Sequence, residues 1–298
     1  MIEVKGITKR FGDFTALDEL TLTVPSGSVY GLVGPNGSGK STIIRHITGI
    51  YRPDGGEILI DGEPVYENPA VKARIAYIPD DVFYFNNASM KDMAKFYQGI
   101  YPNFSTERFE ALLTVFPLDP KRRIRRFSKG MQKQAAFVLC MAMQPDIMVL
   151  DEPIDGLDPV MRRQVWSLLM ADIAERGTTV LGSSHNLREL EDVCDHVGII
   201  DHGKVLIERS LSELQDNIVK LQVAFRPEQS IELSGLNILH SQVTGRVHTL
   251  IVRGSQAEIT EKMVAIDPIF FDLLPLTLEE IFIYELGGAD YAVKNIVL

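Results

Sequence analysis

Two kinds of hydrophobic pattern run along the chain, and their order predicts a mixed α/β fold. Apolar and polar residues alternate at Ile2–Lys5 and Leu20–Val24, as they do in strands with one buried face. Continuously apolar runs at Val29–Val33, Ile147–Leu150 and Val197–Ile200 are typical of strands buried on both faces of a parallel sheet. Because helical periodicity fills intervals between these runs, the alternation of strands and helices predicts an α/β core.

The hydrophobic pattern changes twice along the chain, and each change predicts a part of the fold outside the α/β core. Residues 83–145 are dominated by helical periodicity, which predicts a helical insertion. After residue 215 the order is strand, strand, helix, strand, at Val219–Phe225, Val247–Val252, Gln256–Ala265 and Ile269–Leu274. A capping-box pattern at Thr277–Glu280 predicts a final helix through Leu286. We therefore expect a core domain over residues 1–215, which holds the insertion, and a small α+β accessory domain over residues 216–298.

Composition narrows the class of protein. The 298 residues are 45% hydrophobic and 23% charged, as in an ordinary globular protein. A net charge of −10 argues against a nucleic-acid partner. No apolar stretch reaches the roughly 20 residues that a spanning helix requires, and Met1–Lys5 lacks the features of a secretory signal. We therefore expect a cytoplasmic protein that reaches a membrane only through a partner.

A phosphate-binding loop of the Walker A type follows the strand at Val29–Val33 and precedes a helical segment. Its glycines allow backbone N–H groups and a helix N-terminus to point at an anion. In such a loop Lys40 reaches the β- and γ-phosphates, and the hydroxyl of Ser41 holds Mg²⁺. The residues expected to contact the nucleotide are Gly34, Pro35, Asn36, Gly37, Ser38, Gly39, Lys40, Ser41 and Thr42. The sequence therefore predicts a site for a nucleoside triphosphate.

Two adjacent carboxylates, Asp151 and Glu152, follow the apolar run at Ile147–Leu150, as in a Walker B strand. Asp151 suits Mg²⁺, and Glu152 suits the general base that activates an attacking water. A pair of carboxylates can also be nothing more than a solvated strand end. The phosphate loop earlier in the chain favours the catalytic interpretation.

These motifs occur in the order seen in nucleotide-binding subunits of ABC transporters, and residues 2–215 resemble that family. The resemblance implies that the chain binds ATP with Mg²⁺ and that Phe11 stacks on the adenine. It implies that Ser128 and Gly130 bind the γ-phosphate of an ATP held by the opposite subunit. His185 matches the histidine that contacts the γ-phosphate, so that Glu152, His185 and Lys40 form the catalytic set.

The sequence departs from the family pattern at three positions, Asp80, Lys129 and Met131. Asp80 stands where the family usually has a glutamine that contacts Mg²⁺, Lys129 where it has glycine, and Met131 where it has glutamine. Asp80 still offers an oxygen to Mg²⁺, but its full charge repels a triphosphate unless the metal is present.

The resemblance implies an ATP-hydrolysing subunit that dimerises around ATP, as a homodimer or a heterodimer. It powers a transporter whose membrane subunits are separate polypeptides, and the segment Pro275–Phe282 resembles the tail of exporter ATPases. An alternative is a soluble ABC ATPase that acts on nucleic acid, ribosomes or protein assembly, against which the single cassette and the acidic balance argue. A third is a nucleotide sensor, which has no need of Glu152 and His185.

Overall fold

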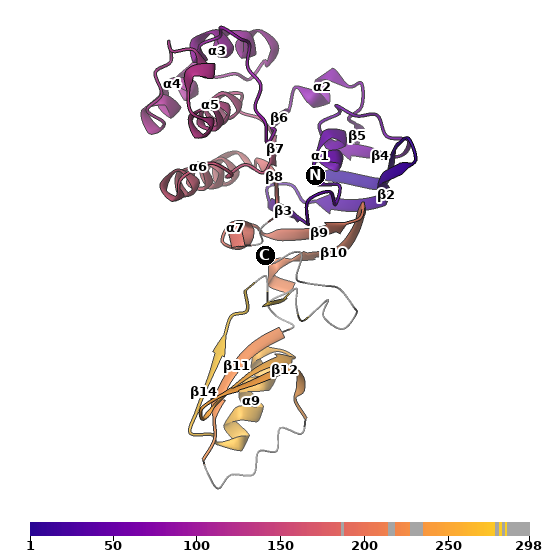
Figure 1. Cartoon of the computed structure of the whole chain (residues 1–298), viewed down its shortest axis with the longest axis vertical. Coiled ribbons are helices and arrows are strands. Elements are labelled where there is room, and N and C mark those ends of the chain that lie inside the picture. The colour runs from indigo at the N-terminus through magenta and orange to yellow at the C-terminus, as the bar shows by residue number, and fades with distance from the viewer. Residues whose placement is uncertain (186–187, 214–217, 227–234, 278–279, 282–283, 285–298) are drawn as a thin grey trace. The chain divides into compact units, whose positions relative to one another are not determined.

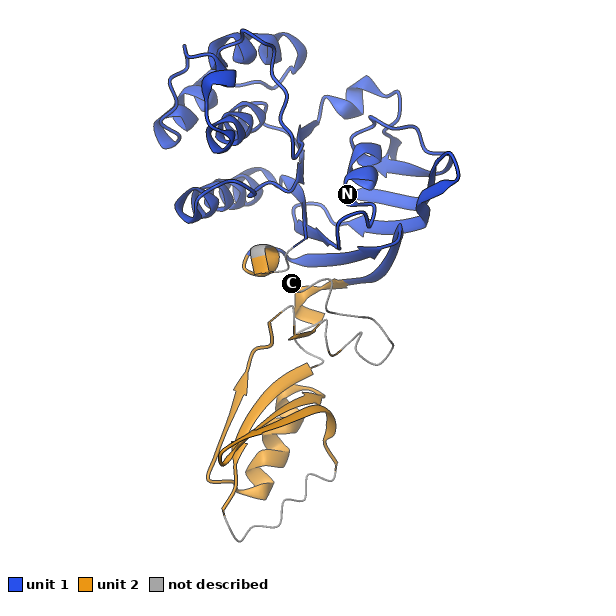
Figure 2. Cartoon of the chain, in the orientation of Figure 1, with its two compact units in different colours: residues 1–185, 193–208 blue, residues 186–192, 209–298 orange. Residues whose placement is uncertain are grey.

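The computed structural model describes residues 1–185, 188–213, 218–226, 235–277, 280–281 and 284. The chain forms two compact units, residues 1–185 with 193–208 and residues 186–192 with 209–298 (Figures 1 and 2). The domain boundary expected between residues 215 and 216 lies outside the described residues and stays a prediction. No helix among the described residues is long and apolar enough to cross a membrane.

A six-stranded sheet with the order β10-β9-β3-β8-β7-β6 forms the centre of the first unit (Figure 1). Its strands are β3 (Val29–Val33), β6 (Ile75–Ile78), β7 (Ile147–Asp151), β8 (Thr179–Ser184), β9 (His196–Asp201) and β10 (Lys204–Ser210). The pairs that join β9, β3, β8, β7 and β6 are all parallel. Every residue of β3, β7 and β8 is buried, which explains the continuously apolar runs Val29–Val33 of β3 and Ile147–Leu150 of β7. The predicted α/β core is confirmed.

A second sheet of the same unit has the order β2-β1-β4-β5 and is antiparallel. Its strands are β1 (Ile2–Phe11), β2 (Phe14–Val24), β4 (Gly55–Ile60) and β5 (Glu63–Pro64). Strand β1 runs well beyond the expected end at Lys5, because register shifts between Val4 and Arg10 interrupt the alternation without ending the pairing. The buried face of this sheet shares one hydrophobic core with β3 and α1 (Lys40–Ile47), through residues such as Leu22, Leu32 and Ile43.

The predicted helical insertion is present between β6 and β7. It contains α3 (Met90–Ile100), α4 (Thr106–Val115), the short 3₁₀ helix η1 (Ile124–Arg126) and α5 (Lys129–Ala142). Figure 1 shows these helices gathered together at one end of the unit, and α5 contacts α3, α4 and β6. Helices α2 (Pro69–Lys72) and α6 (Pro159–Arg176) also belong to this unit, and α7 (Arg188–Glu191) belongs to the other.

The second unit contains an antiparallel sheet with the order β12-β13-β11-β14. Its strands are β11 (Ile218–Ala224), β12 (Asn237–Thr244), β13 (Val247–Arg253) and β14 (Phe270–Leu274), and helix α9 (Gln256–Ile266) packs on this sheet. Ile259 and Met263 of α9 pack with Leu221 and Leu250 of the sheet. The α+β character is therefore confirmed.

In this unit strand β12 was not predicted from the sequence, whereas the capping box at Thr277 was. The sequence did not predict β12, because most of its side chains are exposed and show no alternation. The capping box at Thr277 is formed, since Glu280 N–H donates to Thr277 Oγ1 at 3.2 Å and Thr277 N–H donates to Glu280 Oε2 at 3.0 Å. Most of the helix predicted through Leu286 lies outside the described residues.

Candidate nucleotide-binding site

The phosphate-loop sequence Gly34–Thr42 spans the loop Gly34–Gly39, which connects β3 to α1, and the first turn of that helix (Figure 1). Two of its glycines are required by the geometry. A Cβ at Gly34 would lie 2.1 Å from the carbonyl oxygen of Ile200, and Gly39 has φ +111°, a region that favours glycine. Helix α1 begins directly after Gly39, so the loop ends at a helix N-terminus, where unpaired N–H groups favour an anion.

Lys40 is the first residue of α1 and is 6% exposed. Its Nζ donates to the carbonyl oxygens of Gly34 at 2.6 Å and Pro35 at 3.1 Å, and it lies 3.9 Å from Oε1 of Glu152. Burial lowers the pKa of Lys40, and the carboxylates of Glu152 and Asp151 oppose that shift. The carboxylates therefore favour the ammonium form, which binds phosphate.

Asp151 ends β7 as a buried carboxylate held by two hydroxyls. Ser41 Oγ donates to Asp151 Oδ1 at 3.2 Å, and Ser183 Oγ donates to the same oxygen at 2.7 Å. Ser183 also accepts the N–H of Glu152 at 3.1 Å, so it fixes both acidic residues. Sequence reasoning missed Ser183, which lies on β8. A hydroxyl beside a carboxylate is an oxygen set that fits Mg²⁺.

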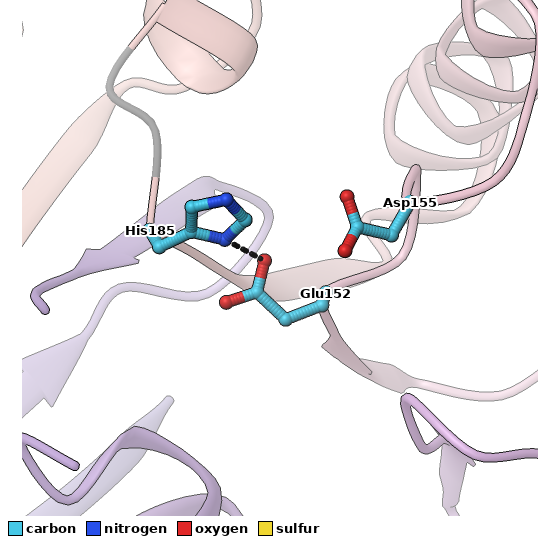
Figure 3. A group of neighbouring side chains, drawn as sticks. All are labelled: Glu152, Asp155 and His185. Atoms are coloured by element: carbon cyan, nitrogen blue, oxygen red, sulfur yellow. Dashed lines mark hydrogen bonds and ion pairs between the residues drawn. The ribbon is translucent and has the colours of Figure 1, made fainter. Parts of the chain in front are cut away.

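Glu152 adopts φ +46°, which is uncommon for a residue other than glycine. Its Oε2 lies 3.0 Å from Nδ1 of His185, and the two side chains form a hydrogen bond (Figure 3). When Glu152 is ionised, its carboxylate accepts this bond and the ring nitrogen donates it. Burial raises the pKa of Glu152, while His185 and Lys40 lower it in part. Asp155 completes a cluster in which one ligand atom from each of Glu152, Asp155 and His185 lies within 4.8 Å of the others.

A cavity of about 330 Å³ lies beside Lys40, Ser41 and Glu152, whereas Asp151 and His185 are not among the residues that line it. It is lined by Phe14, Ala16, Asn36, Gly37, Gly39, Lys40, Ser41, Thr42, Asp80 and Glu152. The structure thus brings together the phosphate loop, Glu152 and Asp80 around one cavity. It also adds Phe14, whose side chain is largely exposed.

Phe11, which was expected to stack on adenine, is not among the residues that line this cavity. Its ring packs edge-on against Tyr51, with centroids 5.8 Å apart, and the ammonium of Lys9 lies 5.6 Å from its centroid. The role of Phe11 stays a prediction. Phe14 pairs directly with Phe11 at the end of the β1–β2 hairpin, and it presents an aromatic ring to the cavity.

Ser128 and Gly130 mark the start of α5 and do not line the cavity at the phosphate loop. Ser128 caps the helix, because its Oγ accepts the N–H of Met131 at 3.3 Å. Gly130 lies so close to the turn after β7 that a Cβ there would be 2.8 Å from the carbonyl oxygen of Gly156. Lys129 is exposed and lines a second cavity, of about 370 Å³, together with Asp80 and Asp155.

A parallel sheet, a glycine loop that opens a helix, and a carboxylate pair at the end of β7, one strand removed from β3, define a phosphate-loop nucleotide-binding protein. The family model described as ABC transporter matches residues 17–155. The chain is 32% identical over 288 residues to the ABC transporter ATP-binding protein YtrB of Bacillus subtilis, which is 97% of this chain and 99% of that protein.

Two further comparisons point to the same family of ATP-binding proteins. The daunorubicin/doxorubicin resistance ATP-binding protein DrrA of Streptomyces peucetius is 36% identical over 224 residues, 73% of this chain and 67% of that protein. A solved structure of an ATP-binding subunit of an ABC transporter matches with a TM-score of 0.67 and 28% identity, over 72% of this chain and 92% of that chain. The chain belongs to the family of ABC transporter ATP-binding proteins. It is an ATP-hydrolysing subunit that powers transport.

Proposed function

We propose that two copies of this subunit, or this subunit and a similar one, enclose two ATP molecules between them. The observation that carries this proposal is the separation of the site into two parts. The phosphate loop and Glu152 line one cavity, whereas Ser128 and Gly130 do not line it. A helix N-terminus with a serine hydroxyl is suited to bind a γ-phosphate, and in this arrangement that phosphate belongs to the ATP on the opposite subunit.

Hydrolysis in this shared site uses residues with distinct tasks. Lys40 and the N–H groups of the phosphate loop bind the β- and γ-phosphates. Glu152 accepts a proton from the attacking water, and His185 orients the carboxylate of Glu152 through their hydrogen bond. Ser41 and Asp151 would hold Mg²⁺, with Asp80 as a further oxygen donor, and the bound metal would offset the charge of the phosphates. Hydrolysis then lets the two subunits separate, and a membrane partner uses that movement.

The partner in this proposal is a pair of membrane-spanning transporter subunits encoded as separate polypeptides, which hold the ATPase at the cytoplasmic face of the membrane. The direction is export, because the relative DrrA is named for resistance to daunorubicin and doxorubicin. The competing role on nucleic acid or ribosomes is disfavoured by the net charge of −10. In this account residues 1–215 form the ATPase domain and residues 216–298 an accessory domain.

Co-purification tests the partner. We expect the tagged ATPase to retain a membrane protein that is encoded beside it and has several spanning helices, and its ATPase rate to change when that protein is reconstituted in vesicles. A chain that retains no membrane protein, and whose ATPase is instead stimulated by ribosomes or RNA, would contradict the transporter role.

Substitution of the two hairpin phenylalanines tests the adenine contact. Stacking of an aromatic ring on a base contributes about 1–3 kcal/mol, so Phe14→Ala is expected to weaken ATP binding by roughly 5- to 100-fold if Phe14 supplies that ring. Phe11→Ala is the matched variant, because the two residues are paired in the same hairpin. Calorimetric titration with ATP decides between them: a loss only in Phe11→Ala assigns the contact to Phe11, and a loss only in Phe14→Ala moves it to Phe14.

A further inference from the structure

Lys133 is a buried lysine on α5 whose side chain reaches the turn that carries Glu152. It is 5% exposed. Its Nζ donates to the carbonyl oxygen of Glu152 at 2.6 Å and to that of Asp155 at 3.3 Å. The contacts are to the backbone, so they do not use the carboxylates drawn in Figure 3. One side chain of the helical insertion thus holds both ends of the turn between Glu152 and Asp155.

The conformation of this turn needs such support. Glu152 has φ +46°, and a left-handed conformation at a residue with a side chain persists only where its surroundings fix it. The Ser183 hydroxyl accepts the N–H of Glu152, and Lys133 binds its carbonyl oxygen. Both polar groups of the Glu152 backbone are therefore fixed by other elements, and the direction of its carboxylate follows from them.

Further contacts join the start of α5 to the same turn and to the segment after β6. The close approach of Gly130 to the Gly156 carbonyl leaves no space for a side chain. Tyr84 Oη donates to the carbonyl oxygen of Gln132 at 2.7 Å, one residue before Lys133. The first turns of α5 therefore pack against the loop that leaves β7 and the loop that leaves β6.

The charge of Lys133 has a counterpart in Asp80. A buried ammonium is unfavourable unless it is paired or hydrogen-bonded. Oδ1 of Asp80 lies 3.6 Å from Nζ of Lys133, and Asp80 lines both the cavity at the phosphate loop and the cavity beside α5. An aspartate at position 80 can therefore serve Lys133 in addition to any role toward Mg²⁺.

We infer that Lys133 is a positioning residue for Glu152 and that Asp80 is its counter-charge. The pair links the loop at residue 80, the helix that begins at Ser128 and the turn that carries the base. This inference rests on the proposed role of Glu152 as the base. The inference has a mechanical consequence. When Ser128 binds the ATP of the opposite subunit, α5 transmits that contact to Glu152 through Lys133. Hydrolysis therefore depends on the contact between Ser128 and the opposite ATP.

The test compares ATP turnover with ATP binding in Lys133→Met, Lys133→Arg, Asp80→Asn and the double variant Asp80→Asn with Lys133→Met. Misplacement of a catalytic group costs up to about 100-fold, so Lys133→Met is expected to lower kcat by about 10- to 100-fold while affinity for a non-hydrolysable ATP analogue changes by less than about threefold. Lys133→Arg recovers most of the rate. At saturating Mg²⁺, which offsets any weakening of metal binding, the double variant is no slower than Lys133→Met alone, because the counter-charge has lost its partner.

Several results would overturn the inference. A kcat of Lys133→Met within about twofold of wild type contradicts positioning, and an equal loss of kcat and ATP affinity indicates a general loss of structure. Effects of Asp80→Asn and Lys133→Met that multiply show that the two residues act independently. If Lys133→Met does not fold, Asp80→Asn tests the pairing instead, because Asp80 is mostly exposed and we expect the fold to tolerate its substitution. An unchanged kcat in Asp80→Asn contradicts the pairing.

Two controls in the same assay separate this inference from the proposed function. Lys95→Met removes an exposed lysine of α3 and is expected to leave turnover unchanged. Glu152→Gln removes the base: if it retains the wild-type rate, the proposed mechanism fails and not the positioning alone. If Glu152→Gln is slow and Lys133→Met is not, only the positioning is wrong.

Discussion

Glu152→Gln is expected to lower ATP turnover by about 10²- to 10⁴-fold, the usual contribution of a general base. Glutamine has the shape of glutamate but accepts a proton far less readily. The surrounding contacts remain, because Ser183 and Lys133 bind the backbone of residue 152 and not its carboxylate. Binding of ATP is therefore retained while hydrolysis is slow.

The same variant is expected to accumulate as an ATP-bound dimer. If hydrolysis is the step that lets the subunits separate, slowing it leaves the closed pair as the stable species. Size-exclusion chromatography with light scattering, with and without Mg²⁺-ATP, measures this directly. Glu152→Asp is a useful control, since it keeps a carboxylate and should dimerise less. A monomer at saturating ATP would contradict the enclosure of ATP between subunits.

Lys40→Met is expected to weaken ATP binding by about 10- to 100-fold. A hydrogen bond to a charged group contributes about 1.5–3 kcal/mol, and each 1.4 kcal/mol is tenfold in affinity. Lys40 is buried at the start of α1, close to the carbonyl oxygens of Gly34 and Pro35. Methionine keeps the length of the side chain without the charge.

Calorimetric titration of ATP in a Glu152→Gln background measures this loss without turnover. Lys95→Met on α3 is the matched control, because it removes an exposed lysine of the same subunit. An affinity of Lys40→Met within about twofold of the control would show that Lys40 does not bind the phosphates.

The sequence predicted the parts of the site that are local in the chain. The residues Gly34–Thr42 are consecutive, and their strand, loop and helix are fixed by neighbouring residues. Asp151 and Glu152 follow a buried strand whose apolar run is itself the signal. The alternation of strands and helices also predicted the α/β class, although the strand order of the central sheet follows only from three-dimensional pairing.

Residues that act through distant contacts could not be predicted in this way. Ser183 reaches Asp151 from another strand, and Lys133 reaches Glu152 from the helical insertion. No local sequence pattern around Ser183 or Lys133 marks either residue as part of the site. Phe11 and Phe14 are both aromatic residues of one hairpin, and only the fold shows that Phe14 lines the cavity. Strand β12 escaped prediction because its exposed side chains carry no periodic signal.

The central claim is that each ATP site is built from two subunits, and mixing two inactive variants tests it most directly. Lys40→Met disables the phosphate loop. Ser128→Asp keeps a good helix cap for α5 but places a negative charge toward the γ-phosphate. Ser128→Asn, which caps equally well without a charge, controls for the substitution itself.

In a mixed dimer, the intact phosphate loop of the Ser128→Asp subunit faces the intact Ser128 of the Lys40→Met subunit. One complete site is therefore restored, and we predict that ATP turnover of the mixture rises well above that of either variant alone. If light scattering shows that the mixed dimer forms and turnover does not rise, the two parts of the site do not act across the subunits, and the shared-site account is wrong.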